Sequence, residues 1–362
     1  MRPRRGLLTA GLLLGLAALA GCTTIEYYWQ GFNGQLELLR KAAPIPEVLS
    51  TEPDPLLRQK LERVVTIRDF ASRELSLPDN GSYRRYTRLD RRFVLWNVFA
   101  VPPLSLKARQ WCFPIAGCVN YRGYFDERDA RAEAARLAAL GDDVFVGGVP
   151  AYSTLGYFDD PVLSTFIRYP DPELARLIFH ELAHQVAYAK DDSLFNESFA
   201  VAVEEEGIRR WLAARNDPAL DAQFASAQRF REAFRSIVRA TRAELAALYA
   251  SKASDEEKRA GKAAILAAMR AHYDAKKVEW GGFGPFDNWF SQEPNNASLT
   301  AVGLYAQKVP QFRALLSSLG NDLPVFYARV KALSLLPREE REQAFAALVP
   351  AVAAGNASRE TR

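Results

Sequence analysis

The apolar residues of the chain follow a helical period near both ends and a strand-like pattern between them. From Glu26 to Ala43 and from Leu56 to Leu75, apolar residues recur every three or four positions between flanking prolines, which predicts two amphipathic helices. Runs rich in β-branched and aromatic residues predict three or more strands, at residues 93–99, 119–125 and 144–146. An alanine-rich helix is expected between two of these strands, at residues 126–140, ending at Gly141.

Beyond Pro170 nearly every segment has a helical pattern. Long helices are predicted at residues 204–215, 222–250 and 255–277. A break rich in glycine and aromatic residues follows at residues 280–290, and three short helices are expected around Asn296, Phe312 and Val330. A small sheet early in the chain with helices after it predicts a mostly helical α+β fold.

The first residues have the layout of an export signal. Three arginines precede an uncharged apolar run from Gly6 to Ala20, and this run is too short to span a bilayer. It ends in Leu-Ala-Gly before Cys22, the pattern at which bacterial lipoprotein signals are cleaved. We therefore expect a mature chain that begins at a lipidated Cys22 and faces the periplasm. Since no aspartate follows Cys22, the outer membrane is the expected location. The alternative is an ordinary cleaved signal or an uncleaved anchor, with Cys22 incidental.

The formal net charge of +4 depends on this leader. Residues 1–21 hold three arginines and no acidic residue, so the rest of the chain carries a charge of +1. No nucleic-acid partner is expected from such a balance. The oligomeric state has no signal in the sequence.

Two further cysteines, Cys112 and Cys118, lie six residues apart. An exported protein meets an oxidising environment, so we predict a disulfide between them. A loop this short gains only about 2 kcal/mol in the chain-entropy model, so the bridge would shape a local turn. The alternative is a metal-binding or redox pair, although no histidine or third cysteine lies nearby.

The strongest chemical signal is an HExxH motif on a helix expected to start at Asp171 and Pro172. His180 and His184 are four residues apart and lie about 40° apart around the helix axis, with Glu181 about 100° from His180. Two neutral imidazoles can then bind one Zn²⁺, and Glu181 can take a proton from the metal-bound water. The alternative is a pair of buried structural histidines.

A catalytic zinc usually has three protein ligands and leaves one position to water. The only other histidine, His272, lies far downstream in a charged helix, so an acidic residue is the better candidate. Glu197 is our first choice, because it opens the next predicted helix after a turn. The remaining candidates for this ligand are Glu204, Glu205 and Asp192. A member of the run 204–206 could instead orient a histidine from behind.

HELAHQ followed by NESFA resembles the gluzincin metallopeptidases. The wider stretch from Trp111 to Phe312, with WCFPIAGC, YRGYFD, AYSTLGYFDDP and NNASL, resembles a family of bacterial predicted aminopeptidases that are exported lipoproteins. The resemblance implies zinc ligands at His180, His184 and Glu197, and a general base at Glu181. Two features depart from the gluzincin pattern. Only twelve residues separate His184 from Glu197, and the GxMEN string that holds a substrate amino terminus is absent.

Gluzincins commonly bind the substrate backbone along an edge strand before the zinc helix, which here points to AYSTLGYFDDP. The candidate substrate contacts are Tyr152, Ser153, Thr154 and Gly156; the alternative is a structural hairpin. A tetrahedral intermediate also needs a hydrogen-bond donor for its oxyanion. Tyr157 and Tyr305 are the candidates for that phenol, against ordinary core packing.

The sequence thus predicts a zinc peptidase of the cell envelope that acts on peptide substrates, with Glu181 activating the zinc-bound water. "Aminopeptidase" rests on the family resemblance alone. The alternatives are an amidase or endopeptidase acting on cell-wall peptides, and a non-catalytic scaffold that keeps zinc for structure. The expected division is a signal peptide at 1–21, helices at 22–80, a zincin-like core at 81–215, a helical part at 216–354 and a frayed tail at 355–362.

Overall fold

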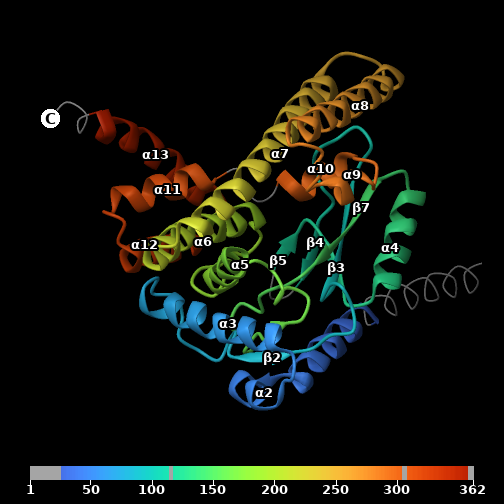
Figure 1. Ribbon diagram of the computed structural model, residues 1–362. Coiled ribbons are helices and arrows are strands. Elements are labelled where there is room, and N and C mark those ends of the chain that lie inside the picture. Colours follow the sequence, from blue (N-terminus) through green and yellow to red (C-terminus); the bar gives the residue numbers. More distant parts are fainter. Residues whose placement is uncertain (1–25, 114–116, 304–307, 358–362) are drawn as a thin grey trace, which may run out of the picture.

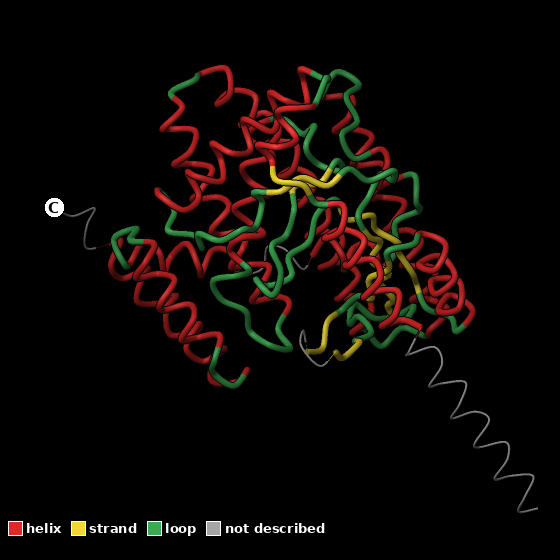
Figure 2. The backbone as a smooth tube through the Cα atoms, turned by 90° about the horizontal axis from the view of Figure 1, so that it is seen from below, coloured by secondary structure: helices red, strands yellow, loops and turns green. Residues whose placement is uncertain are grey.

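The computed structural model describes residues 26–113, 117–303 and 308–357. The protein has a mostly helical α+β fold with small sheets, as predicted (Figure 1). The predicted signal peptide, Cys22 and the end of the predicted tail lie outside the described residues. Figure 2 shows the strands as separate short groups with helices around them.

The N-terminal part combines helices with a three-stranded sheet. Residues 26–41 are helical, as predicted, and α3 (Pro55–Arg73) confirms the second helix. A short helix between them, α2 (Ile45–Thr51), is not among the predicted elements, because prolines in this segment suggest helix boundaries. Proline within a first helical turn disrupts no hydrogen bond, and α2 has one there. The sheet has the order β1 (Ala43–Pro44), β2 (Arg85–Thr87) and β8 (Val162–Leu163).

A second three-stranded sheet forms part of the wall of the cavity that contains the HExxH residues. Its central strand β3 (Leu95–Val101) pairs antiparallel with β6 (Arg122–Tyr124) and with β7 (Asp143–Val149). The helix α4 (Glu127–Ala139) packs on one face of it, and α10 (Asn296–Gly303) packs on the other. Since both faces are covered, β3 is buried along nearly all its length, which explains its continuous apolar run.

The helices α5 (Asp171–Ala183) and α6 (Ser193–Arg215) form the centre of the largest core. Against α6 pack α11 (Val309–Ser318) and α12 (Leu323–Ser334), through aromatic contacts such as those of Phe199 with Phe312 and Phe326. A last helix, α13 (Arg338–Ala357), was not predicted and extends into the expected tail.

A long helical hairpin, α7 (Pro218–Ala250) and α8 (Asp255–Glu279), extends from the centre of the molecule (Figure 1). The short helix α9 (Asp287–Phe290) lies within the predicted glycine-rich break and closes the base of the hairpin, where Phe290 stacks on Tyr273. Across the described ranges, no helix combines the length and apolar character that a membrane crossing requires.

The third strand pair, β4 (Trp111–Phe113) and β5 (Gly117–Val119), contains both cysteines of the predicted disulfide. Cys112 and Cys118 face each other across the pair and are joined through their sulfur atoms. The backbone N–H of Cys118 donates to the carboxylate of Asp191, in the loop before α6. The bridge therefore shapes a hairpin that contacts the segment leading to Glu197.

Candidate metal centre and cavity

The helix α5 presents the HExxH residues on one side because its other side is buried. Ile178, Phe179 and Leu182 are completely buried in the core, so the neighbouring residues of the motif face the opposite way. Asp171 begins α5, but its carboxylate pairs with Lys60 and Arg63 of α3 and does not cap the helix. These ion pairs join α3 to the first turn of α5.

Glu197 reaches the histidines because the loop between α5 and α6 is held in place. The buried side chain of Asn196 accepts a hydrogen bond from the backbone N–H of Ala189 (2.7 Å) and donates one to its carbonyl (2.8 Å). Asp192 caps the start of α6 by accepting from the N–H of Phe195 (3.0 Å). The first turn of α6 is thereby fixed next to α5, and Glu197 lies in that turn.

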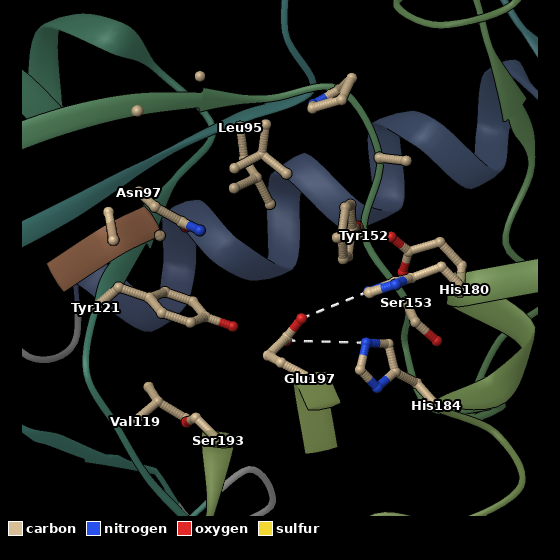
Figure 3. A pocket seen from close by; sticks show the side chains of 18 of the residues that line it. Leu95, Asn97, Val119, Tyr121, Tyr152, Ser153, His180, His184, Ser193 and Glu197 are labelled. Carbon is tan, nitrogen blue, oxygen red and sulfur yellow. Dashed lines mark ion pairs between the residues drawn. The ribbon is translucent and has the colours of Figure 1, made fainter. Parts of the chain in front are cut away.

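The three predicted ligands converge in space. Donor atoms of His180, His184 and Glu197 all lie within 4.8 Å of one another. The Nε2 atoms of the two histidines lie 3.4 and 3.8 Å from the two carboxylate oxygens of Glu197 (Figure 3). Ligands about 2.1 Å from a tetrahedral zinc are roughly 3.4 Å apart, so the spacing fits a zinc ion.

Hydrogen bonding around these atoms also fits a cation. Nδ1 of His180 lies 2.9 Å from Oε2 of Glu204, so it carries the ring proton that this hydrogen bond needs. Nε2 of a neutral His180 then presents a lone pair to Glu197, whose Oε2 is buried without a hydrogen-bond partner among the described residues. Two acceptors that face each other at this distance need a proton or a metal ion between them.

Glu204 does not join the three ligand atoms but holds His180 from behind. Its second oxygen lies 2.7 Å from Arg176, and Arg176 also pairs with Glu173 (3.1 Å). The sequence left Glu204 open as a third ligand or an orienting residue; the geometry favours the orienting role. The other candidates lie elsewhere, with Glu205 paired to Arg313 and Asp192 paired to Arg341.

Burial and charge set the protonation of these groups. Burial lowers the pKa of His180, but its hydrogen bonds with Glu197 and Glu204 and the charges of Glu204 and Glu181 outweigh this and raise it to about 10, so a proton stays on Nε2 until a metal ion replaces it. Burial lowers the pKa of His184 to about 4, so this ring is neutral. Although burial opposes it, the charges of Arg176 and His180 lower the pKa of Glu204 to about 2. The carboxylates thus attract a positive charge to the site.

The pKa of Glu181 is raised, whereas that of Glu204 is lowered. Burial raises its pKa to about 7, and the charges of Glu197, Asp160 and Glu204 add to that effect while His180 opposes it. A carboxyl group with a pKa near neutrality can both accept and return a proton in one reaction cycle.

The site opens into a cavity of about 880 Å³. Its walls come from the N-terminal helix, from β3, β6 and β7, and from α5, α6, α7 and α10. Most of the lining is apolar and aromatic, and the phenol of Tyr121 points across the cavity toward Glu197 (Figure 3). A space of this size and composition suits an organic ligand.

The predicted substrate segment is a loop, and it contains no strand between residues 151 and 161. Tyr152 and Ser153 line the cavity. Thr154 does not; its side chain and backbone N–H donate to Asp160 (2.8 and 2.9 Å). Gly156 has φ +82°, a turn conformation that suits glycine, and it also lies outside the lining.

The edge strand next to the cavity is instead β7. It is one of the two outer strands of its sheet, and its last residues, 147–149, line the cavity together with 150–153. At its other end, the carbonyl of Val144 accepts a hydrogen bond from Asn295 (2.9 Å). The strand predicted at residues 144–146 is thus the edge strand beside the cavity, and the segment 151–161 that follows it is a loop.

Of the two predicted oxyanion donors, only Tyr157 is among the described residues, and it is not brought to the site. Tyr157 is 67% exposed and does not line the cavity, and Tyr305 lies outside the described residues. The tyrosines that do line it near Glu197 are Tyr121 and Tyr188. Burial raises the pKa of Tyr121, and it raises that of Tyr188 to about 12. Both are therefore protonated, potential donors at neutral pH.

The HExxH residues and Glu197 therefore lie together beside a cavity lined mainly by apolar and aromatic side chains. The chain belongs to the family described as "Putative aminopeptidase", whose family model matches residues 26–345. This membership supports a peptidase-like function. Searches of curated proteins and of solved structures found no match to the chain.

Proposed function

We propose that this protein is a zinc-dependent peptidase whose metal would be held by His180, His184 and Glu197. The observation that carries the proposal is the convergence of their donor atoms within 4.8 Å, beside a cavity large enough for a peptide segment. Two histidines and one glutamate are the ligand set of several zinc peptidases, in which the fourth position is left open. Bound zinc would supply a Lewis acid that lowers the pKa of water and polarises the substrate carbonyl.

The side chains of the chain supply the remaining chemistry. Glu181 takes a proton from the attacking water and passes it to the leaving amine. Glu204 fixes the ring of His180, and Arg176 keeps Glu204 ionised. Tyr121 lies across the cavity from α5 and offers its hydroxyl to the oxygen that becomes negative in the transition state.

Substrate would bind as an added strand along β7. β7 is an edge strand, and Gly147 and Gly148, near its end, line the cavity. An extended peptide can form backbone hydrogen bonds with such an edge, and these bonds are independent of the peptide's sequence. Tyr152 and Ser153, which follow β7 in the chain, also line the cavity, and we expect them to contact the substrate.

The test combines metal analysis with turnover of a peptide library read by mass spectrometry. We expect one zinc per chain, and we expect Glu181→Gln to keep the zinc while turnover falls about 10²–10⁴-fold. Glu206→Gln is the matched control, because Glu206 pairs with Arg209 and Arg210 and does not line the cavity. Full turnover in Glu181→Gln, or a protein that binds no zinc, would overturn the proposal.

The products of the same digestion define the type of peptidase. Peptides shortened one residue at a time from the amino terminus would indicate an aminopeptidase, as the family description suggests. Internal cuts would indicate an endopeptidase, and release of cell-wall peptides an amidase. Zinc binding without any turnover would leave a structural scaffold.

We also propose that the protein is held in the cell envelope by lipid on Cys22, facing the periplasm and most simply at the outer membrane. The support is the arginine-led apolar run that ends at this cysteine. Mass spectrometry of the mature amino terminus tests this directly. We expect an acylated Cys22. A mature amino terminus at another residue would contradict the proposed lipid anchor.

A further inference from the structure

Three arginines line the same cavity as the metal-binding residues. Arg176 lies on α5, one turn before His180, and Arg231 and Arg235 lie one turn apart on α7. Arg176 is engaged with Glu204 and Glu173, so its charge is used in holding the site. The two arginines of α7 are less fully occupied.

Arg231 has one free donor. Its Nη1 forms an ion pair with Glu173 (2.9 Å), but its Nη2 is buried without a hydrogen-bond partner among the described residues. A buried donor left unpaired costs free energy of about 1–3 kcal/mol. A ligand with a negatively charged oxygen would satisfy this atom.

Arg235 is half-buried and forms no ion pair within the part of the chain that the structure describes. Arg235 interacts electrostatically with Glu205, but Glu205 already forms an ion pair with Arg313. Its guanidinium can therefore bind a ligand without breaking an existing contact, and a carboxylate matches its planar pair of donors.

The charge balance of the cavity also favours an anion. Its acidic lining residues are Glu181, Glu197 and Glu204, equal in number to its arginines. A divalent metal would make the lining positive by two charges, and Glu173, which lies behind the arginines, lowers this to one. A free amino group would find no acidic residue in this lining apart from those three.

We propose that Arg231 and Arg235 form a subsite for a carboxylate of the peptide substrate; this rests on the function proposed above. Glu173, the partner of Arg231, is seven residues before His180, or about 10 Å along α5. An extended chain covers roughly 3.5 Å per residue. The carboxylate therefore lies about two or three residues from the bond that is cleaved, as in a short peptide with a free carboxyl terminus or an acidic side chain.

Binding to zinc-loaded Glu181→Gln protein, measured by titration calorimetry, tests this without turnover. Three tetrapeptides of otherwise identical sequence serve as probes: a free acid, its carboxyl-terminal amide, and an amide with one glutamate side chain. The free acid is expected to bind about tenfold more tightly than the plain amide, as for a charged hydrogen bond. Tighter binding of the glutamate amide alone would assign the subsite to an acidic side chain.

Arg235→Gln is expected to abolish this preference, and Arg235→Lys to keep part of it. Arg239→Gln is the control, because Arg239 is one turn further along α7, is exposed and pairs with Glu232 outside the cavity lining. Equal binding of all three peptides, no binding of any, or a preference that survives Arg235→Gln would overturn the subsite. The proposed zinc-peptidase function is tested by zinc content and turnover, so any of these outcomes would overturn the subsite without contradicting that function.

Discussion

The imidazole of His180 lies between two carboxylates, with Nδ1 2.9 Å from Glu204 and Nε2 3.4 Å from Glu197. One carboxylate fixes the tautomer of the ring, and in the proposed zinc site the other would bind the same cation as Nε2. The two glutamates are seven residues apart on α6, two helical turns, so they project from the same side of the helix.

Loss of the rear carboxylate should therefore weaken metal binding. Glu204→Gln removes the charge that orients His180, and we expect zinc affinity to fall about 10–100-fold. Competition with a chromophoric chelator measures this, with Glu206→Gln as the control on the same helix. Unchanged zinc affinity would show that the contact between Glu204 and His180 serves packing only.

The hydroxyl of Tyr121 should matter for the chemical step. Tyr121→Phe keeps the ring in place and removes the donor, so kcat should fall about 10²-fold, with KM and zinc content nearly unchanged. Tyr157→Phe is the control, because that side chain is largely exposed and outside the cavity lining. Equal kcat values for the two variants would exclude Tyr121 as a donor to the reacting oxygen.

Much of the site follows from local spacing, which the sequence displays directly. His180 and His184 are one turn apart on a helix whose start and buried side are visible in the pattern, and Glu197 follows at the start of the next helix. The role of Glu204 was left open, because helical spacing places it on the same side as Glu197 without showing which imidazole nitrogen it faces.

Other parts of the site depend on contacts between distant segments. Tyr121 faces Glu197 only because β5 and β6 lie across the cavity from α6, and no local pattern indicates that. Glycine and aromatic residues at 151–161 suggest an edge strand, a hairpin or a loop, and the structure has a loop there. The edge strand beside the cavity is β7, which contains the strand predicted at 144–146 and pairs with β3 over residues 143–149. The short helix α2 is not evident from the sequence for a local reason, because prolines that suggest a helix boundary lie at positions where a helix can start.

Asp160 gives the folded protein a distinctive pH dependence. Burial raises its pKa to about 6 from a usual value of 3.8, although hydrogen bonds from Thr154 oppose this. The folded state therefore binds a proton between pH 4 and 6 that the unfolded state has lost. The contribution of Asp160 to stability is complete below pH 4 and is lost as the pH rises through 6, a change of order 3 kcal/mol.

Asp160→Asn isolates this effect, because an amide can keep a contact with Thr154 but does not titrate. Urea unfolding of the metal-free protein at pH 4 and pH 7 gives the difference in stability between the variant and the parent. Relative to the parent, the variant should have a higher free energy of unfolding at pH 7 than at pH 4. A difference that is the same at both values would show that Asp160 titrates normally in the folded protein.

The contact of α5 with α6 depends on the small size of Gly207. A Cβ atom at this buried position would lie 2.8 Å from the ring of Phe179 and 2.9 Å from Leu75. Helix propensity alone favours alanine by about 0.5–1 kcal/mol, but overpacking a filled core costs about 1–3 kcal/mol. Gly207→Ala should therefore lower the free energy of unfolding and, through the shift of Phe179 beside His180, weaken zinc binding.

Gly31→Ala, where no atom lies within 4 Å of the new Cβ, should stabilise the protein instead. A stabilising Gly207→Ala would mean that the two helices can separate without disturbing the ligands that they carry.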